Sequence, residues 1–288
     1  MELKGLSLLK GKALELSDKI SVIHPKISDI EEIGEEKYSE LFSSLCATSI
    51  DVADILCFDL NIWYEDIKDE WEFFLQKCLI DSKEISVRIK YENFNIPILE
   101  EHCLAIGNSY RDTLNFFLKL SGEYIILEKN INNIPQKIIY NVSPFYDGNN
   151  ILYYILEEQT CFKFTKFFYE KTIKFLDTIN WAKRDYEFLK GGSKGAKKYI
   201  LRNTLYRQRK KTKKDIITLE SIVSSLIAKG ISYNEIWNLP IYSLYSIYYR
   251  LVKIDEYDNT MKALYSGCVD TKKNPINWEK VNWSTVIS

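Results

Sequence analysis

Apolar residues in the first half of the chain follow both helical and strand periods. From Ile62 to Leu79 they recur every three or four positions, with charged residues between them, which is typical of an amphipathic helix. A shorter helix is expected from Ser109 to Leu120. Asp29 and Glu32 are expected to cap another short helix, because a side-chain acceptor and a carboxylate three positions later can satisfy the free N–H groups of a first turn.

Strand patterns lie among these helices. Residues 87–91 alternate apolar and charged side chains, and Pro97 then limits this strand to an edge or an end. Residues 124–128 and 137–142 are rich in β-branched residues and tyrosine, and turn residues separate them, so they predict a β-hairpin. The first half is therefore expected to mix α and β structure.

Helical spacing prevails after the turn at residues 147–150. Residues 151–156 and 162–179 are expected to supply apolar faces for packing between helices. We therefore predict an α+β protein with a boundary near residue 145: a mixed α/β domain at residues 1–145 and a mainly helical domain at residues 146–288.

Helix-end signals are clear in the last third. The apolar stripe of residues 219–227 ends at Gly230, a residue suited to a C-terminal cap. Ser232 and Glu235 have the spacing of a capping box, and Pro240 fits the first turn of a further helix. A tail, residues 265–288, follows, and we expect Trp278 and Trp283 to strap it across a neighbouring surface, either of the same chain or of another copy.

Charge is segregated along the chain. Residues 190–214 hold eleven Lys or Arg and no Asp or Glu, whereas the rest has 39 − 11 = 28 basic against 40 acidic residues, a net charge of −12. Such a stretch is expected to meet phosphates, an acidic partner or the acidic face of its own neighbour. It should become helical from about Ala196. The candidate partner- or polyanion-binding residues are Lys194, Lys197, Lys198, Arg202, Arg207, Arg209, Lys210, Lys211, Lys213 and Lys214.

Two functions stay open for the basic stretch. Its cations and tyrosines could neutralise phosphates and stack on bases of DNA or RNA. The acidic remainder of the chain would repel a polyanion, however, and no helix-turn-helix, zinc-finger or RNA-binding signature accompanies the stretch. Contact with other protein subunits is therefore the preferred hypothesis, and nucleic-acid binding is the alternative.

No catalytic, metal or cofactor motif is found. Residues 191–198 have the composition of a phosphate loop, but Ala196 and Lys198 occupy positions where that motif needs glycine and a hydroxyl. The chain has only His24 and His102, and its six cysteines form no CxxC pair. We expect a protein that is not an enzyme, has no cofactor and folds in a cytoplasm with reduced thiols. No apolar run is long enough to span a membrane.

The last third of the chain resembles accessory proteins encoded in the tail-gene modules of phages, and of phage-tail-like particles, from low-GC Gram-positive bacteria. The residues that carry the resemblance are Gly230, Tyr233, Ile236, Trp237, Gly267, Val269, Asp270, Lys272, Lys273 and Trp278. The resemblance implies a non-enzymatic part in tail or baseplate assembly, as a virion subunit or as an assembly chaperone. The implied partners are other tail or baseplate subunits and further copies of the chain in an oligomer. The implied location is the host cytoplasm during assembly and then the virion or tail-like particle.

Overall fold

The computed structural model divides into two compact units, which we describe separately. It describes residues 5–18, 20–53, 55–80, 104–105, 108–120, 125–131, 134–140, 145–146, 151–155, 160–182, 192–210, 217–267 and 276–277. Unit 1 comprises Met1–Gly11, Pro25–Glu32 and Ile216–Ser288, and unit 2 comprises Lys12–His24 and Ile33–Asp215. The expected boundary near residue 145 does not coincide with this division. One sheet of unit 2 contains strands from both sides of residue 145, so backbone hydrogen bonds join the chain across that point.

A three-stranded antiparallel sheet brings together distant parts of unit 2. Its order is β1 (Leu14–Ser17), β2 (Ile20–Val22) and β4 (Leu118–Leu120). Ile20 and Val22 alternate with the less buried Ser21, which is the pattern of a strand with one face on the core. The register between β1 and β2 shifts between Glu15 and Ser17, as in a β-bulge.

The second sheet corrects the prediction of helix at residues 151–156. Its order is β3 (Leu104–Ala105), β7 (Phe145–Tyr146), β8 (Ile151–Ile155) and β9 (Thr160–Phe164), and each pair is antiparallel. The short apolar run at residues 151–156 fits a helix and a buried strand equally well. Pairing with the neighbouring strands shows that it is a strand. The start of the helix predicted at 162–179 is wrong for the same reason, since α6 (Lys166–Ile179) begins only after β9.

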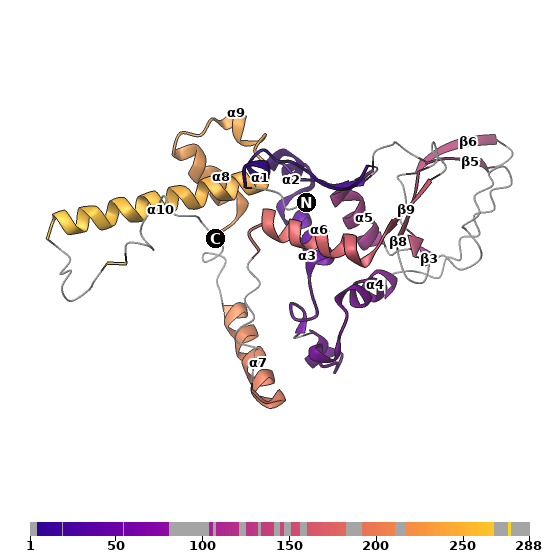
Figure 1. The fold of residues 1–288 in the computed structure, drawn as a ribbon, viewed down its shortest axis with the longest axis horizontal. Helices are drawn as coiled ribbons and strands as arrows, with labels where there is room; N and C mark the ends of the chain where they lie inside the picture. The colour runs from indigo at the N-terminus through magenta and orange to yellow at the C-terminus, as the bar shows by residue number, and fades with distance from the viewer. Residues whose placement is uncertain are drawn as a thin grey trace. The chain divides into compact units, whose positions relative to one another are not determined.

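The predicted hairpin is confirmed as β5 (Ile125–Ile131) and β6 (Ile134–Tyr140). The two strands lie side by side (Figure 1). Their antiparallel register pairs Ile131 with Ile134 at the turn end and Ile125 with Tyr140 at the other end. The strand predicted at residues 87–91 lies outside the described residues.

Aromatic residues of α4 and α6 form a core in unit 2. The helices of this unit are α3 (Glu35–Cys46), α4 (Glu70–Ile80), α5 (Asn108–Phe117), α6 and α7 (Lys194–Lys210). Trp71 and Phe74 of α4 pack on Tyr169 of α6, with ring centroids 5.3 and 4.8 Å from the tyrosine ring. Phe164, at the end of β9, lies in the same cluster and is fully buried. These contacts fix α4 and α6 against each other.

The helix predicted to start at Ile62 begins eight residues later. Tyr64–Asp66 form one turn of 3-10 helix, and α4 begins at Glu70. Asp69 sets the N-terminal end of α4. Its carboxylate accepts the Trp71 N–H at 2.9 Å, and its carbonyl accepts the Phe73 N–H. The residues between Trp63 and Asp69 are thereby free to form a different structure, which carries the candidate site described below.

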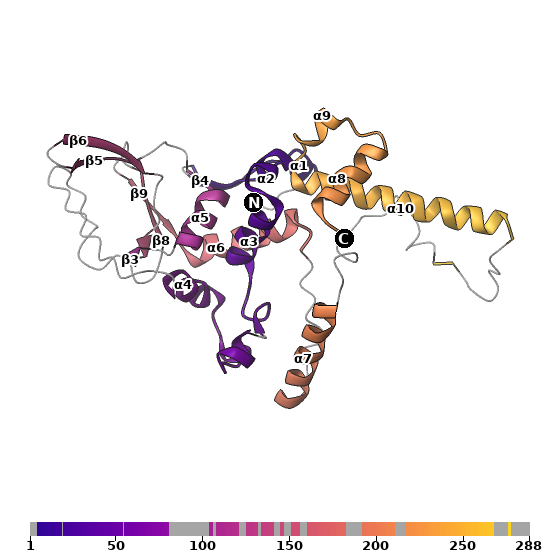
Figure 2. The ribbon, with the colours of Figure 1, turned by 180° about the vertical axis from the view of Figure 1, so that it is seen from behind.

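Unit 1 consists of helices from the two ends of the sequence. They are α1 (Gly5–Leu9), α2 (Ile27–Ile33), α8 (Leu219–Ala228), α9 (Tyr233–Ile236) and α10 (Ile241–Tyr265). The beginning of α10 lies beside α1 and α8, and the rest of this helix extends beyond them (Figures 1 and 2). Ile241 and Leu244, at the start of α10, are fully buried.

Helix ends in unit 1 agree in part with the sequence signals. Gly230 has φ 96° and ends α8 as predicted, with the Ile231 N–H donating to the Leu226 carbonyl in a Schellman arrangement. Ser232 and Pro240 are the residues that precede α9 and α10, but the Ser232 side chain makes no capping bond, so the predicted capping box is incomplete. Asp29 caps α2 from inside its first turn, where it accepts the Lys26 N–H at 2.8 Å, because this helix begins before Asp29.

The ends of the sequence are joined by backbone contacts within unit 1. The Ile27 and Ser28 N–H groups donate to the Leu239 and Trp237 carbonyls, and the Ile241 N–H donates to the Pro25 carbonyl, each at 3.0 Å. The Ser243 hydroxyl donates to the Leu9 carbonyl at 2.6 Å. The α+β fold class with a helical C-terminal half is therefore confirmed, and its last helices are completed by residues from the beginning of the chain.

Candidate functional site

The middle of the basic stretch forms α7, which begins two residues before the predicted position. Ser193 starts the helix, since its carbonyl accepts the Lys197 N–H and its hydroxyl accepts the Ala196 N–H at 3.3 Å. Gly192 precedes it with φ 84°, a conformation that favours glycine. Residues 194–198 of the segment with the composition of a phosphate loop therefore form the first turn of a helix.

The partner of α7 is the segment from Thr48 to Asp69, which we call the anchor segment. Its start is fixed by the Asp51 carboxylate, which accepts both the N–H and the hydroxyl of Thr48 at 2.8 Å. It continues through a π-helical turn, η1 (Ile55–Asp59), and the 3-10 turn η2 (Tyr64–Asp66). Between them Asn61 adopts φ 54°, a left-handed conformation that asparagine tolerates better than most residues.

Apolar packing holds α7 on the anchor segment. Leu201 of α7 is 7% exposed and belongs to one buried cluster with Ala53, Leu56, Cys57, Trp63 and Tyr64. Ile200 packs against the same cluster. Burial of these side chains supplies the main stabilisation of the contact, since a fully buried Leu contributes on the order of 2 kcal/mol.

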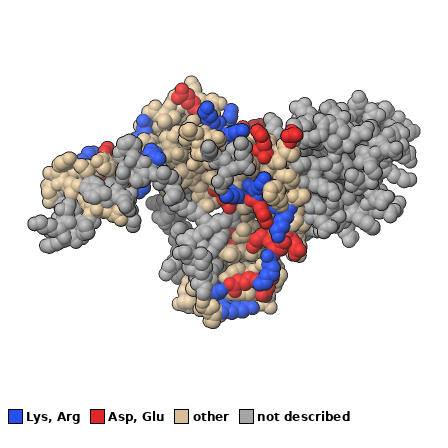
Figure 3. All heavy atoms as spheres, in the orientation of Figure 1, with Lys and Arg blue, Asp and Glu red and all other residues tan. Residues whose placement is uncertain are grey.

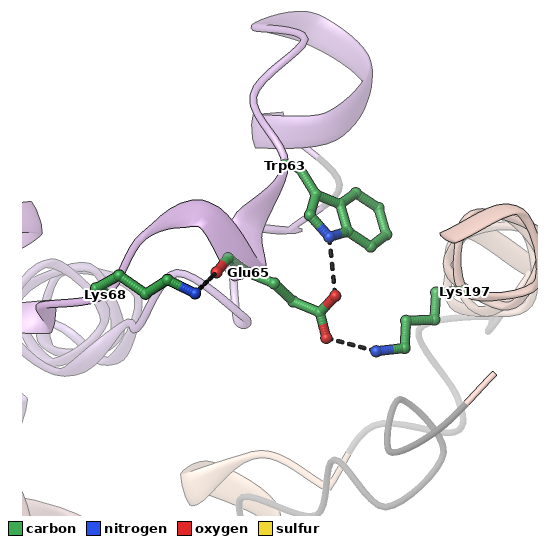
Figure 4. Close-up of polar contacts among 4 residues, drawn as sticks. All are labelled: Trp63, Glu65, Lys68 and Lys197. Carbon is green, nitrogen blue, oxygen red and sulfur yellow. Dashed lines mark hydrogen bonds and ion pairs between the residues drawn. The ribbon is translucent and has the colours of Figure 1, made fainter. Parts of the chain in front are cut away.

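Glu65 connects the polar rim of this cluster (Figure 4). Its carboxylate accepts hydrogen bonds from Lys197 Nζ at 2.5 Å and from the Trp63 indole N–H at 2.8 Å, while Lys68 Nζ donates to its backbone carbonyl at 3.1 Å. The Lys197 side chain is 11% exposed and that of Glu65 is 44% exposed. The hydrogen bonds from Lys197 and Trp63 hold the pKa of the Glu65 carboxyl below its usual value.

Two further cations of α7 lie over aromatic rings of the anchor segment. Lys194 Nζ is 4.9 Å from the Trp63 ring centroid, and the Arg202 guanidinium carbon is 5.5 Å from the Phe58 ring centroid. Cation–π contacts of partly exposed groups contribute about 0.5–1 kcal/mol each. Lys194, Lys197 and Arg202 therefore all contact the anchor segment of their own chain.

The remaining candidate cations divide into three groups. Lys198 is half-buried on α7. Arg207, Arg209 and Lys210 belong to α7, although the structure describes only their backbone. Lys211, Lys213 and Lys214 lie outside the described residues, as do Trp278 and Trp283 of the expected strap. Which of the three expected targets the basic stretch meets stays a prediction.

Sequence reasoning missed the anchor segment. Trp63 and Ile67 have helical spacing with Trp71, so the pattern predicts one continuous helix. Spacing alone does not show that the helix begins only after Asp69. The available signal was the pair Asp59 and Asn61, which flank Leu60 and are more common in turns than in helices.

The described ranges place the side chains of one of the two histidines and three of the six cysteines. No group of three or more His, Cys, Asp or Glu there is arranged to hold a metal ion. His24 is buried, and burial lowers its pKa to about 4, while His102 lies outside those ranges. Cys46, Cys57 and Cys78 are buried. Among the helices of the described residues, none has the length and apolar character needed to cross a membrane.

The fold and the site together define a protein with an α+β unit, in which a basic helix is anchored to its own chain, and a unit that contains a long helix. Residues 209–288 match the family model described as the YomV second domain, and this match indicates a phage-derived family for the last third of the chain. The matched region nearly coincides with the C-terminal segment of unit 1, which begins at Ile216. No curated protein and no solved structure matches the chain.

Proposed function

We propose that this protein is a non-enzymatic component of a phage tail or baseplate, or a chaperone of its assembly, and that it acts by binding other protein subunits. The observation that carries the proposal is the family match at residues 209–288, in the same third of the chain that resembles phage tail-module proteins. The protein is then made in the host cytoplasm and, as a subunit, enters the virion or tail-like particle.

The contacts of α7 favour protein partners over nucleic acid. Lys197 is neutralised by Glu65, and Lys194 and Arg202 lie over aromatic rings, so these three cations are less available to phosphates. Acidic and basic side chains also lie close together on the face shown in Figure 3, rather than forming a uniform cationic surface over the described residues. The cations that decide between the two functions are those toward the end of the basic stretch.

The experiment is assembly in a host that produces the phage or tail-like particle. Deletion of the gene should yield particles with absent or incomplete tails, and a tagged copy should restore them. Reversal of Arg207, Arg209, Lys210 and Lys211 to Glu should weaken assembly in a salt-sensitive way. Reversal of Lys4, Lys10, Lys26 and Lys262 to Glu is the control with the same change in net charge, and it should assemble normally.

Two outcomes would contradict the proposal. Normal particles without the gene would remove the role in assembly. Binding of a labelled duplex or single strand that weakens steeply with salt, and is lost in the first variant only, would favour nucleic acid, because the salt dependence counts the phosphates neutralised.

A further inference from the structure

Five large apolar side chains are exposed where α7 meets the anchor segment. Their exposed fractions are 48% for Ile55, 36% for Phe58, 58% for Leu60, 45% for Ile62 and 69% for Tyr199. Arg202 lies over Phe58 of the anchor segment. Tyr199 precedes Arg202 by about one turn of α7, so Tyr199 lies on the side of α7 that contacts Phe58. We call these five residues the apolar surface.

The backbone holds this surface in place. The Leu60 N–H donates to the Ile55 carbonyl at 3.1 Å, and the Ile62 N–H donates to the Leu56 carbonyl at 2.7 Å. Leu56 and Cys57, which lie between Ile55 and Phe58, and Trp63, which follows Ile62, are buried in the cluster under α7. Four exposed apolar side chains within eight consecutive residues are thus fixed outward, and contiguous exposed patches of this kind mark interaction sites.

Both signs of charge border the apolar surface. Asp59 and Asp66 are exposed on the anchor segment, while Arg202 is exposed and Lys198 is half-buried on α7. These two aspartates belong to the anchor segment, which also carries the exposed Lys68, and these two cations belong to α7. A two-fold axis through such a surface places the acidic side of one copy against the basic side of the other and brings the apolar residues together in the middle.

We propose that the apolar surface binds the same surface of a second copy of this chain, in a two-fold symmetric dimer. An apolar centre with aromatic residues and arginine, bordered by charged residues, is the usual composition of a protein–protein interface. A strand of nucleic acid fits less well, because Ile55, Leu60 and Ile62 offer no ring for base stacking and the two aspartates repel phosphates. The inference does not depend on a phage role, so each can fail alone.

Sedimentation velocity over a range of concentrations of the whole protein, treated with nuclease, tests the dimer. The wild type should change from monomer to dimer as its concentration rises. The double variant Leu60→Asp/Ile62→Asp should weaken dimerisation at least about tenfold, since it buries two charges at the centre of the interface. Phe167→Asp, a change at an apolar residue of α6 that is 58% exposed, is the matched control and should dimerise as the wild type does.

A charge swap tests the symmetry. Lys198→Glu alone and Asp59→Lys/Asp66→Lys alone should each dimerise more weakly, because each places like charges opposite one another. An equimolar mixture of the two variants should regain a dimer that contains one copy of each. A wild type that stays monomeric at the highest concentration, an unchanged dimer of the double variant, or a mixture that stays monomeric would each overturn the proposal.

Discussion

His24 shows how one buried side chain makes stability depend on pH. It is 7% exposed, and its ring meets the edge of Phe175 with centroids 5.9 Å apart. Burial lowers its pKa from 6.5 to about 4, against a smaller opposing effect of a backbone hydrogen bond at Lys12. The unfolded chain therefore binds a proton at a higher pH than the folded protein does.

We expect His24 to destabilise unit 2 as the solution is acidified. A lowered folded-state pKa leaves stability intact above about pH 6.5, and the loss grows as pH falls toward 4, to a total of about 3 kcal/mol. Urea unfolding between these pH values measures it. His24→Gln should flatten the slope, whereas Lys26→Gln should keep it. An unchanged slope in His24→Gln would assign the acid sensitivity to other groups.

Gly11 is a position where a single methyl group should be costly. Its φ is 71°, and a Cβ there would lie 2.5 Å from Cγ of Pro240, a ring that cannot rotate away. Gly11→Ala should therefore destabilise unit 1 by about 2–4 kcal/mol, through backbone strain and overlap together.

Two other glycines separate the cost of backbone strain from the cost of steric overlap. Gly34→Ala has the strain of φ 89° with no atom near its Cβ, so it should cost only about 1 kcal/mol, and Gly5→Ala has neither problem. Thermal unfolding of the three variants should give the order Gly11, Gly34, Gly5 from most to least destabilised. Equal values for Gly11 and Gly34 would show that the proline moves aside.

At the level of elements, the attachment of α7 should depend on Leu201 more than on its charges. Leu201→Ala removes a buried side chain from the cluster and should weaken the attachment by about 2–4 kcal/mol. Hydrogen exchange of the α7 amides measures this directly, because a detached helix loses protection. Phe167→Ala, at an exposed residue of α6, should leave the protection of α7 nearly unchanged.

The ion pair should have a smaller effect on the same helix. Glu65→Gln should reduce α7 protection only about two- to fivefold, because its carboxylate is 44% exposed and solvent screens the pair. Since Lys197 and Trp63 lower the pKa of Glu65, its contribution is complete above about pH 4.5 and fades as pH falls below that value. A loss as large as that of Leu201→Ala would show that the charge, not the apolar cluster, fixes α7.

Local sequence signals predicted the elements that depend on near neighbours. The hairpin β5–β6, the apolar stripe of α8 and its end at Gly230 follow from turn chemistry and periodicity within about ten residues. The position of β8 could not be predicted in this way, because its partners include β7 and β9 and only pairing separates a short apolar strand from a helix.

Of the two parts of the candidate site, the sequence pointed to the basic helix α7 and not to the anchor segment. Charge predicted that the basic stretch meets something anionic, and within the chain Lys197 pairs with Glu65. The targets of its other cations stay a prediction. Glu65 lies 132 positions away in the sequence, and it resembles the other solvated carboxylates of the chain until Trp63 and Lys197 are brought to it. The exposed residues of the anchor segment had no local signal, since exposure depends on what packs elsewhere.

For the whole molecule, the matched region of 80 residues is shorter than the unit in which it folds. Ile241 and Leu244 are fully buried at the start of α10, where the segments that carry α1 and α2 join it. A fragment of residues 209–288 should therefore unfold at a lower temperature and less cooperatively than unit 1 does in the full chain, as followed by circular dichroism. A cooperative transition at the same temperature would show that α1 and α2 contribute nothing.

The hydrogen bond from Ser243 to Leu9 joins residues 234 positions apart. Closing a flexible loop of that length costs about 5 kcal/mol of chain entropy, so early contact between the two ends is unfavourable. The first helix also leaves the ribosome long before its partner exists, and it must wait while unit 2 folds. The residues that enclose α1 therefore emerge only after those of unit 2, and until then the chain presents an open unit 1 to the proteases and chaperones of the cell.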